Sequence, residues 1–356
     1  MNLANFKRLL TANAGRRTIY AQGPSGAGKS SVVRQYFDEN EEMSFWQDVR
    51  LGQRDSGEVK GILLPDLVNM CTIQSRPDYF PLPDEGSDVK GVLVLDEFDH
   101  ATPAAQSAAY ELILDRKIGN YKLPDGIEIV MLSNSRADGG LHFDVPKPIK
   151  NRVIMVHVRP DTEEWLVHAR SYGINPIILS FIKENPEYLF FGGDVTTDNK
   201  GDLGAFASPR SWFTADDTLD FQNVDDLLEE ILEGTIGIKT TKAFLDYMVI
   251  ANSNVSIENI LGNKYKEYAE DTDDIEDLSI INYNLECLTG YIAREEVDSS
   301  KFNMGIANWI GLVQDNDSRT LIVRAVMGVA PKMLKPLKSN KEGTALMKDI
   351  MNDIVI

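Results

Sequence analysis

The 356-residue sequence predicts an α/β protein, in which a five-stranded parallel sheet with helices on both faces is followed by mainly helical regions. Three observations predict this αβα sandwich. Short apolar segments alternate with segments of helical periodicity up to about residue 160. A glycine-rich loop of the form GxxxxGK[ST] joins the first apolar segment to a helical one. One segment, residues 92–95, is apolar at every position, as expected of a strand that is covered on both sides.

The expected strands follow one another with two irregular excursions between them. They are predicted over residues 18–22, 45–49, 91–96, 127–133 and 153–158. After the second strand, prolines interrupt the stretch 50–83 and exclude a long helix, so we expect an insertion that projects from the core. Residues 116–126 have the turn residues of a hairpin and precede the fourth strand.

The loop after the first expected strand has the residues of a phosphate-binding loop. Its three glycines allow consecutive backbone N–H groups to surround an oxyanion, and the following helix adds the positive end of its dipole. We expect Lys29 to bridge the β- and γ-phosphates of a nucleotide and the Ser30 hydroxyl to bind Mg²⁺. The residues expected to bind the nucleotide here are Gly23, Pro24, Ser25, Gly26, Ala27, Gly28, Lys29, Ser30 and Ser31. A flexible Gly/Ser turn would not explain the lysine and serine at these offsets.

Two acidic residues end the third expected strand, at the sheet edge to which the first strand brings the phosphate loop. Asp96 is expected to hold Mg²⁺ together with Ser30, and Glu97 to polarise a water for attack on the γ-phosphorus. Without the phosphate loop, two surface acids at the end of a strand would be the simpler interpretation. The glutamate favours hydrolysis over phosphoryl transfer to a second substrate, because a kinase excludes activated water.

Three more polar residues are candidates for the same site. If the fourth strand lies between the first and third, Asn134 at its end would orient the attacking water, although an asparagine in a turn fits the spacing equally well. Arg210 follows Ser208 and Pro209, which predict the start of a helix, and could face the nucleotide. Arg152, just ahead of the fifth strand, could reach the phosphate of a neighbouring subunit. A surface ion pair is the alternative for both arginines.

The composition is that of a folded protein, with 43% apolar and 26% charged residues. We see neither a secretory signal nor an apolar run near the ~18 residues needed to span a bilayer, so we expect a cytoplasmic protein without membrane contact. The formal net charge of −19 makes a constitutive nucleic-acid binder less expected. The two cysteines and four histidines have no metal-ligand spacing, so the sequence supports no metal besides nucleotide-bound Mg²⁺.

Past the fifth strand the pattern becomes helical. Helices are expected after the capping box at 161–164, and over 177–183, from 209, over 224–232 and over 241–250. We therefore expect three domains. These are a nucleotide-binding αβα domain over 1–160, a helical lid over 161–250, and an additional helical region of unknown role over 251–356.

With these residues placed, the sequence resembles the MoxR group of AAA+ ATPases over roughly residues 17–215. The matching pieces are residues 23–30, 50–53 with 61–62, 93–126, Asn134, 151–153, 163–165 and 207–210. The resemblance implies a ring, usually hexameric, that uses ATP and Mg²⁺, with Asn134 as sensor one, Arg210 as sensor two and Arg152 as the arginine finger. Two places depart from the family pattern: Asp99 and His100 replace an asparagine–arginine pair, and Val153 replaces a phenylalanine.

The function implied by this resemblance is that of a MoxR-like AAA+ ATPase that remodels or assembles a protein partner. Members of the group often work with a von Willebrand factor A-domain protein, which is therefore one expected partner. Two alternatives stay open, a DNA-directed motor or loader and a nucleotide-gated binding module with slow hydrolysis.

Overall fold

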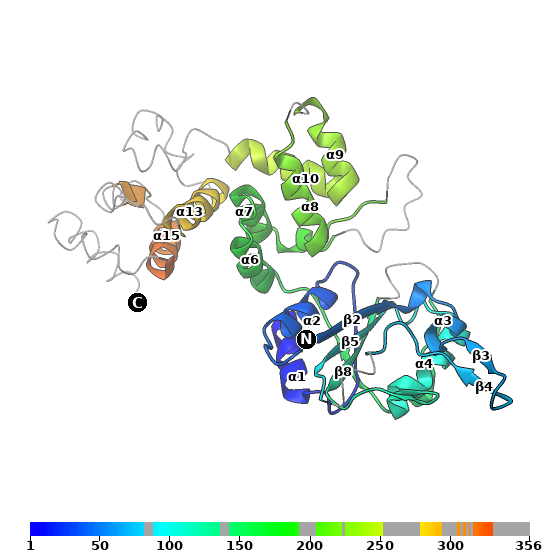
Figure 1. Cartoon of the computed structure of the whole chain (residues 1–356). Helices are drawn as coiled ribbons and strands as arrows, with labels where there is room; N and C mark the ends of the chain where they lie inside the picture. The colour runs from blue at the N-terminus through cyan, green and yellow to red at the C-terminus, as the bar shows by residue number, and fades with distance from the viewer. Residues whose placement is uncertain are drawn as a thin grey trace. The chain divides into compact units, whose positions relative to one another are not determined.

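The computed structural model of the chain describes residues 1–81, 88–135, 142–191, 204–222, 225–251, 278–293, 305–306, 309–310, 313 and 316–329. These residues form two compact units. The first contains the described residues of Met1–Glu164 together with Ser208–Arg210, and the second contains the remaining described residues from Trp165 onward. Figure 1 labels many of the elements of both units.

The first unit is built on a parallel five-stranded sheet. Its strands are β1 (Ile19–Gly23), β2 (Phe45–Arg50), β5 (Gly91–Asp96), β8 (Ile127–Asn134) and β9 (Ile154–His157). They lie in the order β2-β5-β8-β1-β9, and every neighbouring pair is parallel. All five expected strands are present, and β8 lies between β1 and β5, as the expected role of Asn134 required. The predicted α/β fold with a five-stranded parallel sheet is therefore confirmed.

Helices cover both faces of this sheet, because its central strands are apolar on both sides. In β5, Val92 and Val94 pack with α1 (Leu3–Asn13) and α2 (Lys29–Asp38). The alternate residues Leu93 and Leu95 belong to the core of the opposite face. That face is covered by α3 (Ser56–Lys60), α4 (Pro103–Asp115) and α5 (Lys147–Lys150). The result is a three-layered unit with a buried central sheet.

Both predicted excursions are present. The stretch after β2 forms a short 3₁₀ turn η1 (Leu51–Gln53), the helix α3 and an antiparallel hairpin of β3 (Leu63–Asp66) and β4 (Cys71–Gln74). This hairpin extends from the sheet unit beside α3 (Figure 1). The hairpin expected before the fourth strand is formed by β6 (Lys117–Ile118) and β7 (Tyr121–Lys122).

The second unit is helical. Its elements are most of α6 (Thr162–Ser171), then α7 (Pro176–Glu184), η4 (Pro186–Leu189), α8 (Pro209–Leu219) from Ser211 onward, η5 (Asp225–Leu227), α9 (Leu228–Ile236), α10 (Ile238–Ala251), α13 (Leu278–Ala293) and α15 (Asn316–Val329). Phe181, Trp212 and Phe244 lie at its centre and are almost fully buried. Arg170 joins α6 to α13 through two hydrogen bonds to the buried Glu286. In the part of the chain that the structure describes, no helix has the length and apolar character to span a membrane.

Candidate nucleotide-binding site

The loop between β1 and α2 has a backbone that depends on glycine. Gly26 and Gly28 have φ angles of +74° and +89°, in the left-handed region that residues with a side chain rarely adopt. Gly23 has no room for a side chain, since a Cβ there would lie 2.3 Å from the carbonyl oxygen of Val158. A Cβ at Gly26 would lie 2.9 Å from Ser208 Oγ. The turn therefore leads directly into the first N–H groups of α2, which is the cradle that a phosphate requires.

Lys29, the first residue of α2, is 6% exposed and lies within this loop. Its ammonium group donates hydrogen bonds to the carbonyl oxygens of Gly23 and Pro24, each at 2.8 Å. It also donates to Oδ1 of Asn134 at 3.2 Å. Because Asn134 is paired in register with Gly23 across β8 and β1, the amide expected to act as a sensor lies directly beside the loop. Ser30 follows Lys29 in the first turn of α2.

The two acidic residues lie on the other side of β8. Asp96 ends β5, and its Oδ1 accepts a hydrogen bond of 2.8 Å from the backbone N–H of Glu97. Glu97 has a φ angle of +54°, a left-handed conformation that costs of order 1–3 kcal/mol in a residue other than glycine. Such conformations persist where the surrounding structure holds them, and they cluster at active sites. The chain thus turns sharply between the residue expected to hold Mg²⁺ and the expected base.

The carboxylate of Glu97 lies against η1. A Cβ added to Gly52 would be 3.2 Å from Glu97 Oε2 and 3.0 Å from His100 Cβ. Residues 50–53 were part of the family resemblance, but no role was expected for Gly52. The contact between Gly52 and Glu97 was therefore not predicted from the sequence. The only signal in the sequence was a glycine beside a predicted strand end.

A third carboxylate, which the sequence analysis also missed, belongs to this sheet edge. The loss of water around Asp48 on β2, followed by the negative charge of Asp96, raises the pKa of its carboxyl, while Arg50 opposes the shift. Glu97 adds a smaller effect in the same direction as Asp96. Asp48 thus lies near Asp96 and Glu97, while Arg50, paired in register with Asp96, adds a positive charge beside them. Parallel pairing of β2 with β5 is what brings Asp48 here, and it is invisible in the sequence.

The two candidate arginines have different surroundings. Arg210, exposed and second in α8, lies in the same compact unit as the phosphate loop, and its Cβ is 3.4 Å from the position of a Cβ on Gly26. Arg152 is exposed in the turn before β9, where its backbone N–H donates to the carbonyl of Ile149 at 2.9 Å. The structure therefore brings Arg210 to the loop and leaves Arg152 on the surface of the sheet unit.

Histidines expected to form no metal-ligand grouping prove to be neighbours in space. Along the sequence His100 and His142 are far apart, but in the structure they lie together with Asp99. The expectation rested on spacing along the sequence, which cannot show that the turn after β5 and the segment before α5 come together.

The carboxyl ends of three adjacent strands therefore bring together a glycine-rich loop, a lysine, an amide and two carboxylates. No family model matches the chain, and no curated protein matches it. Among solved structures, it is similar to a mutant of RuvB from Thermotoga maritima, at 15% identity and a TM-score of 0.39 over 79% of this chain and 82% of that one. It is also similar to NtrX from Brucella abortus in complex with ATP, at 17% identity and a TM-score of 0.35 over 92% and 68% of the two chains. Likenesses this slight leave the site geometry to carry the functional argument.

Proposed function

We propose that this chain is a MoxR-like AAA+ ATPase that hydrolyses ATP in an oligomeric ring, usually hexameric, to remodel or assemble a protein partner. The observation that carries the proposal is the hydrogen bond from Lys29 Nζ to Asn134 Oδ1, together with the adjacent turn that carries Asp96 and Glu97. The first contact joins the loop to the end of β8, and β5, which ends at Asp96, pairs with β8 at the same sheet edge, where open α/β sheets bind their ligands.

The residues present fit a magnesium nucleotide. The glycine backbone and the N-terminal end of α2 would surround the phosphates, and Lys29 would exchange carbonyl oxygens of its own loop for phosphate oxygens. Ser30 and Asp96 would hold Mg²⁺, which supplies neutralisation of the phosphate charge. Both are oxygen donors, as this hard cation prefers.

The chemistry of hydrolysis would then rest on three side chains. Glu97 would take a proton from the attacking water, and contact with Gly52 limits the positions its carboxylate can adopt. Asn134 would orient the same water through its amide. Arg210 would stabilise charge on the phosphate within the same chain.

The test of the base is Glu97→Gln, which keeps size and hydrogen bonding but removes the proton acceptor. We expect the turnover number for ATP to fall by about 100-fold or more, within the range for loss of a general base, while ATP affinity is kept. Glu39→Gln, the same change at the exposed end of α2, is the matched control and should leave both quantities unchanged. Turnover of the Glu97 variant at the control rate would refute the assignment.

The ring predicts a site shared between subunits. Arg152 is exposed, as a residue that acts on a neighbouring subunit must be. An arginine supplied in this way typically accelerates hydrolysis by about 10³-fold or more. Arg152→Ala and Lys29→Ala subunits should each be inactive alone and regain activity when mixed, because some mixed interfaces combine an intact loop with an intact arginine. Absence of rescue in assembled mixtures would remove the support for a finger in trans.

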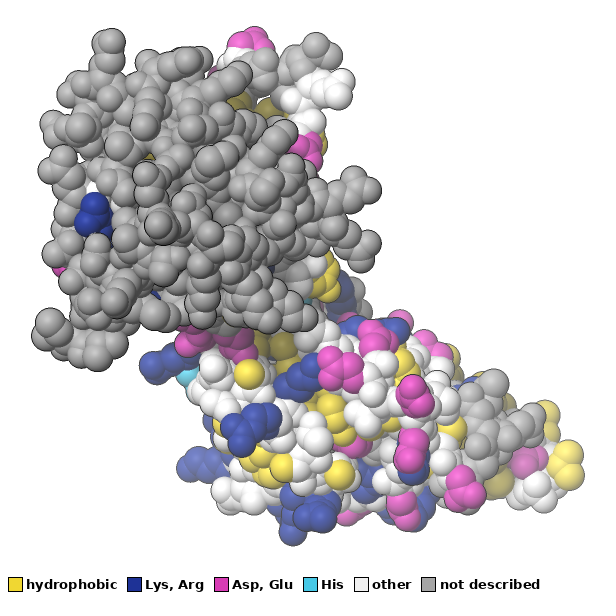
Figure 2. Space-filling model, turned by 90° about the vertical axis from the view of Figure 1, so that its left-hand side faces the viewer, with side chains coloured by type: hydrophobic (Ala, Val, Ile, Leu, Met, Phe, Trp, Pro, Cys, Tyr) yellow, Lys and Arg dark blue, Asp and Glu magenta, His cyan; other side chains and the backbone are white. Residues whose placement is uncertain are grey.

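The β3–β4 hairpin supports a protein partner. It and its immediate flank expose large apolar side chains, namely Ile62, Leu63, Leu64, Leu67, Val68, Met70 and Ile73. Residues 62–74 contain no lysine or arginine, so this surface lacks the charge that nucleic acid requires. On the described part of the face in Figure 2, basic and acidic side chains both occur among white and yellow ones. An exposed apolar surface of this kind fits an unfolded or apolar protein segment.

The partner is tested on the same hairpin. Leu67→Asp with Val68→Asp should weaken binding of a reduced, carboxymethylated model protein while basal ATP hydrolysis is kept. Asp66→Asn with Asn69→Asp, which keeps the charge balance at the same tip, is the control. ATP hydrolysis that rises with added DNA and declines steeply with salt would instead favour a DNA-directed motor.

A further inference from the structure

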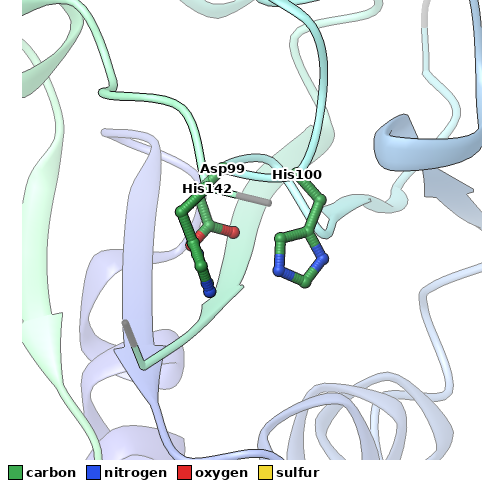
Figure 3. Close-up of side chains that lie close together, drawn as sticks. All are labelled: Asp99, His100 and His142. Atoms are coloured by element: carbon green, nitrogen blue, oxygen red, sulfur yellow. The ribbon is translucent and has the colours of Figure 1, made fainter. Parts of the chain in front are cut away.

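Three side chains that can bind a metal come together beside the candidate nucleotide site. Asp99 and His100 lie in the turn after β5, and His142 comes from the segment that leads to α5 (Figure 3). His142 Nδ1 is 2.8 Å from Asp99 Oδ2, and the two imidazole rings meet edge to face with their centroids 4.6 Å apart. One possible ligand atom from each residue lies within 4.8 Å of the others.

Two atoms of this cluster are buried without a hydrogen-bond partner among the described residues. They are Oδ1 of Asp99, a residue that is 4% exposed, and Nε2 of His100. A buried polar group left unsatisfied costs about 1–3 kcal/mol, and a charged group costs more. Two such groups beside each other therefore need a common explanation.

An ion pair between Asp99 and His142 does not supply that explanation. The pair uses Oδ2 of Asp99 and Nδ1 of His142, so Asp99 Oδ1 and His100 Nε2 still have no hydrogen-bond partner among the described residues. It also gives no reason for the second imidazole to stand opposite the first, as Figure 3 shows. A cation bound between the three side chains would satisfy both orphaned atoms at once.

The separations are close to those of ligands on one ion. In a tetrahedral zinc site with bonds of about 2.0–2.2 Å, two ligand atoms lie about 3.4 Å apart. One ligand atom from each of the three residues lies within 4.8 Å of the others, so no separation needs a contraction of more than about 1.4 Å, within reach of side-chain rotation.

We propose that Asp99, His100 and His142 form a site for a divalent transition metal ion, with Zn²⁺ as the best-fitting occupant. One carboxylate oxygen of Asp99, Nε2 of His100 and one ring nitrogen of His142 are its three protein ligands, and a fourth position stays open. Two imidazoles and a carboxylate are a donor set for zinc and similar metals, whereas Mg²⁺ prefers oxygen donors alone. The site is therefore chemically separate from the Mg²⁺ position assigned to Ser30 and Asp96.

Such an ion would add a link between two segments that already contact each other. The turn after β5 and the segment before α5 share a backbone hydrogen bond, from Phe143 N to the carbonyl oxygen of Asp99 at 2.7 Å. Bound metal would hold these segments together at a point three residues beyond Glu97. This inference concerns metal binding by the folded chain and does not depend on ATP hydrolysis.

The test uses the full-length chain freed of metal with a chelator. Addition of Co²⁺ should give the visible absorption of a four-coordinate site at one ion per chain, and Zn²⁺ should abolish it by competition. Zn²⁺ affinity is then measured against a chromogenic indicator for His100→Gln and His142→Gln. We expect each variant to lose affinity by about 100-fold or more, since even loss of an outer partner costs about 10–100-fold.

His157→Gln is the matched control, because His157 is an exposed histidine on β9 outside the cluster. It should bind Zn²⁺ as the unchanged chain does. Far-UV circular dichroism in the absence of metal checks that each variant is folded. Asp99→Asn is a further variant, which changes the third ligand with a smaller change of side chain. The proposal is overturned if the unchanged chain binds no stoichiometric metal, or if folded His100 and His142 variants bind it as tightly as the control.

Discussion

Replacing Gly52 with alanine adds one methyl group next to the glutamate that we propose as the base. Gly52 is not in the left-handed region, so alanine suits its backbone and the change tests packing alone. The new methyl carbon would lie 3.0 Å from His100 Cβ and 3.2 Å from Glu97 Oε2. Since contacts between such atoms are normally about 3.5–4.0 Å, the neighbours must retreat by about 0.5 Å.

The size of the effect on the rate depends on how far the residues around the new methyl group can move. His100 Cβ is attached to the backbone, so the turn after β5, and with it the carboxylate of Glu97, has to shift. A misplacement of about 1 Å in an active site can cost about 100-fold in rate, and half that distance corresponds to about tenfold. The overpacked contact should also lower the free energy of unfolding by about 1–3 kcal/mol.

Steady-state ATP hydrolysis and equilibrium ATP binding together show whether the change affects the position of Glu97 or the binding of ATP. We expect kcat to fall about tenfold while the dissociation constant for ATP stays the same, because the phosphate loop is untouched. Gly57→Ala is the control, since a Cβ there meets only the side-chain oxygen of Asp55, at 3.2 Å. If Gly52→Ala turns over ATP at the rate of the control, η1 does not position the glutamate and our reasoning is wrong.

Two further predictions concern stability. Burial raises the pKa of Glu128, so the folded state favours the protonated carboxyl, and stability is lost as pH rises through the folded-state pKa. The Glu128→Gln variant should therefore become more stable relative to the unchanged chain as pH rises from 5 to 8. Tyr36→Phe removes the hydrogen-bond donor that lowers this pKa, so the unchanged Glu128 should lose more stability over the same pH range in that variant. Urea unfolding at both pH values measures the free energy of unfolding of each chain. Arg170→Ala leaves the buried carboxylate of Glu286 without its bidentate partner and should cost about 3 kcal/mol in the same assay. Removal of an exposed pair by Lys90→Ala should cost less than about 1 kcal/mol, and equal costs for the two would contradict the burial argument.

Much of the sheet unit could be predicted because its signals are local. An apolar run such as residues 92–95 has to be covered on both faces, and the glycines before Lys29 suit a left-handed turn into a helix. Pro209 likewise marks the first residue of α8 as expected. In each case a few adjacent residues determine the backbone, so no knowledge of distant segments is needed.

The contacts of the site could be predicted only on the condition that particular strands lie side by side. Asn134 was expected to matter if its strand lay between the first and third, and only strand pairing decided that it lies beside Lys29. Asp48 and Gly52 could not be assigned at all, because their neighbours come from β5 and the turn after it. Which strands pair depends on packing of whole faces, and a single segment does not encode it.

The sequence by itself determined the order of strands and helices, the phosphate loop and the acidic pair, because hydrophobic periodicity, glycine and proline act on neighbouring residues. The tertiary structure alone decided which side chains share a space. It placed His142 against Asp99 and His100 across 43 and 42 positions of the chain, where one-dimensional spacing gives no hint of a metal site. The physical reason is that a parallel sheet brings the carboxyl ends of separate strands to one edge. Which side chains become neighbours there therefore depends on which strands pair.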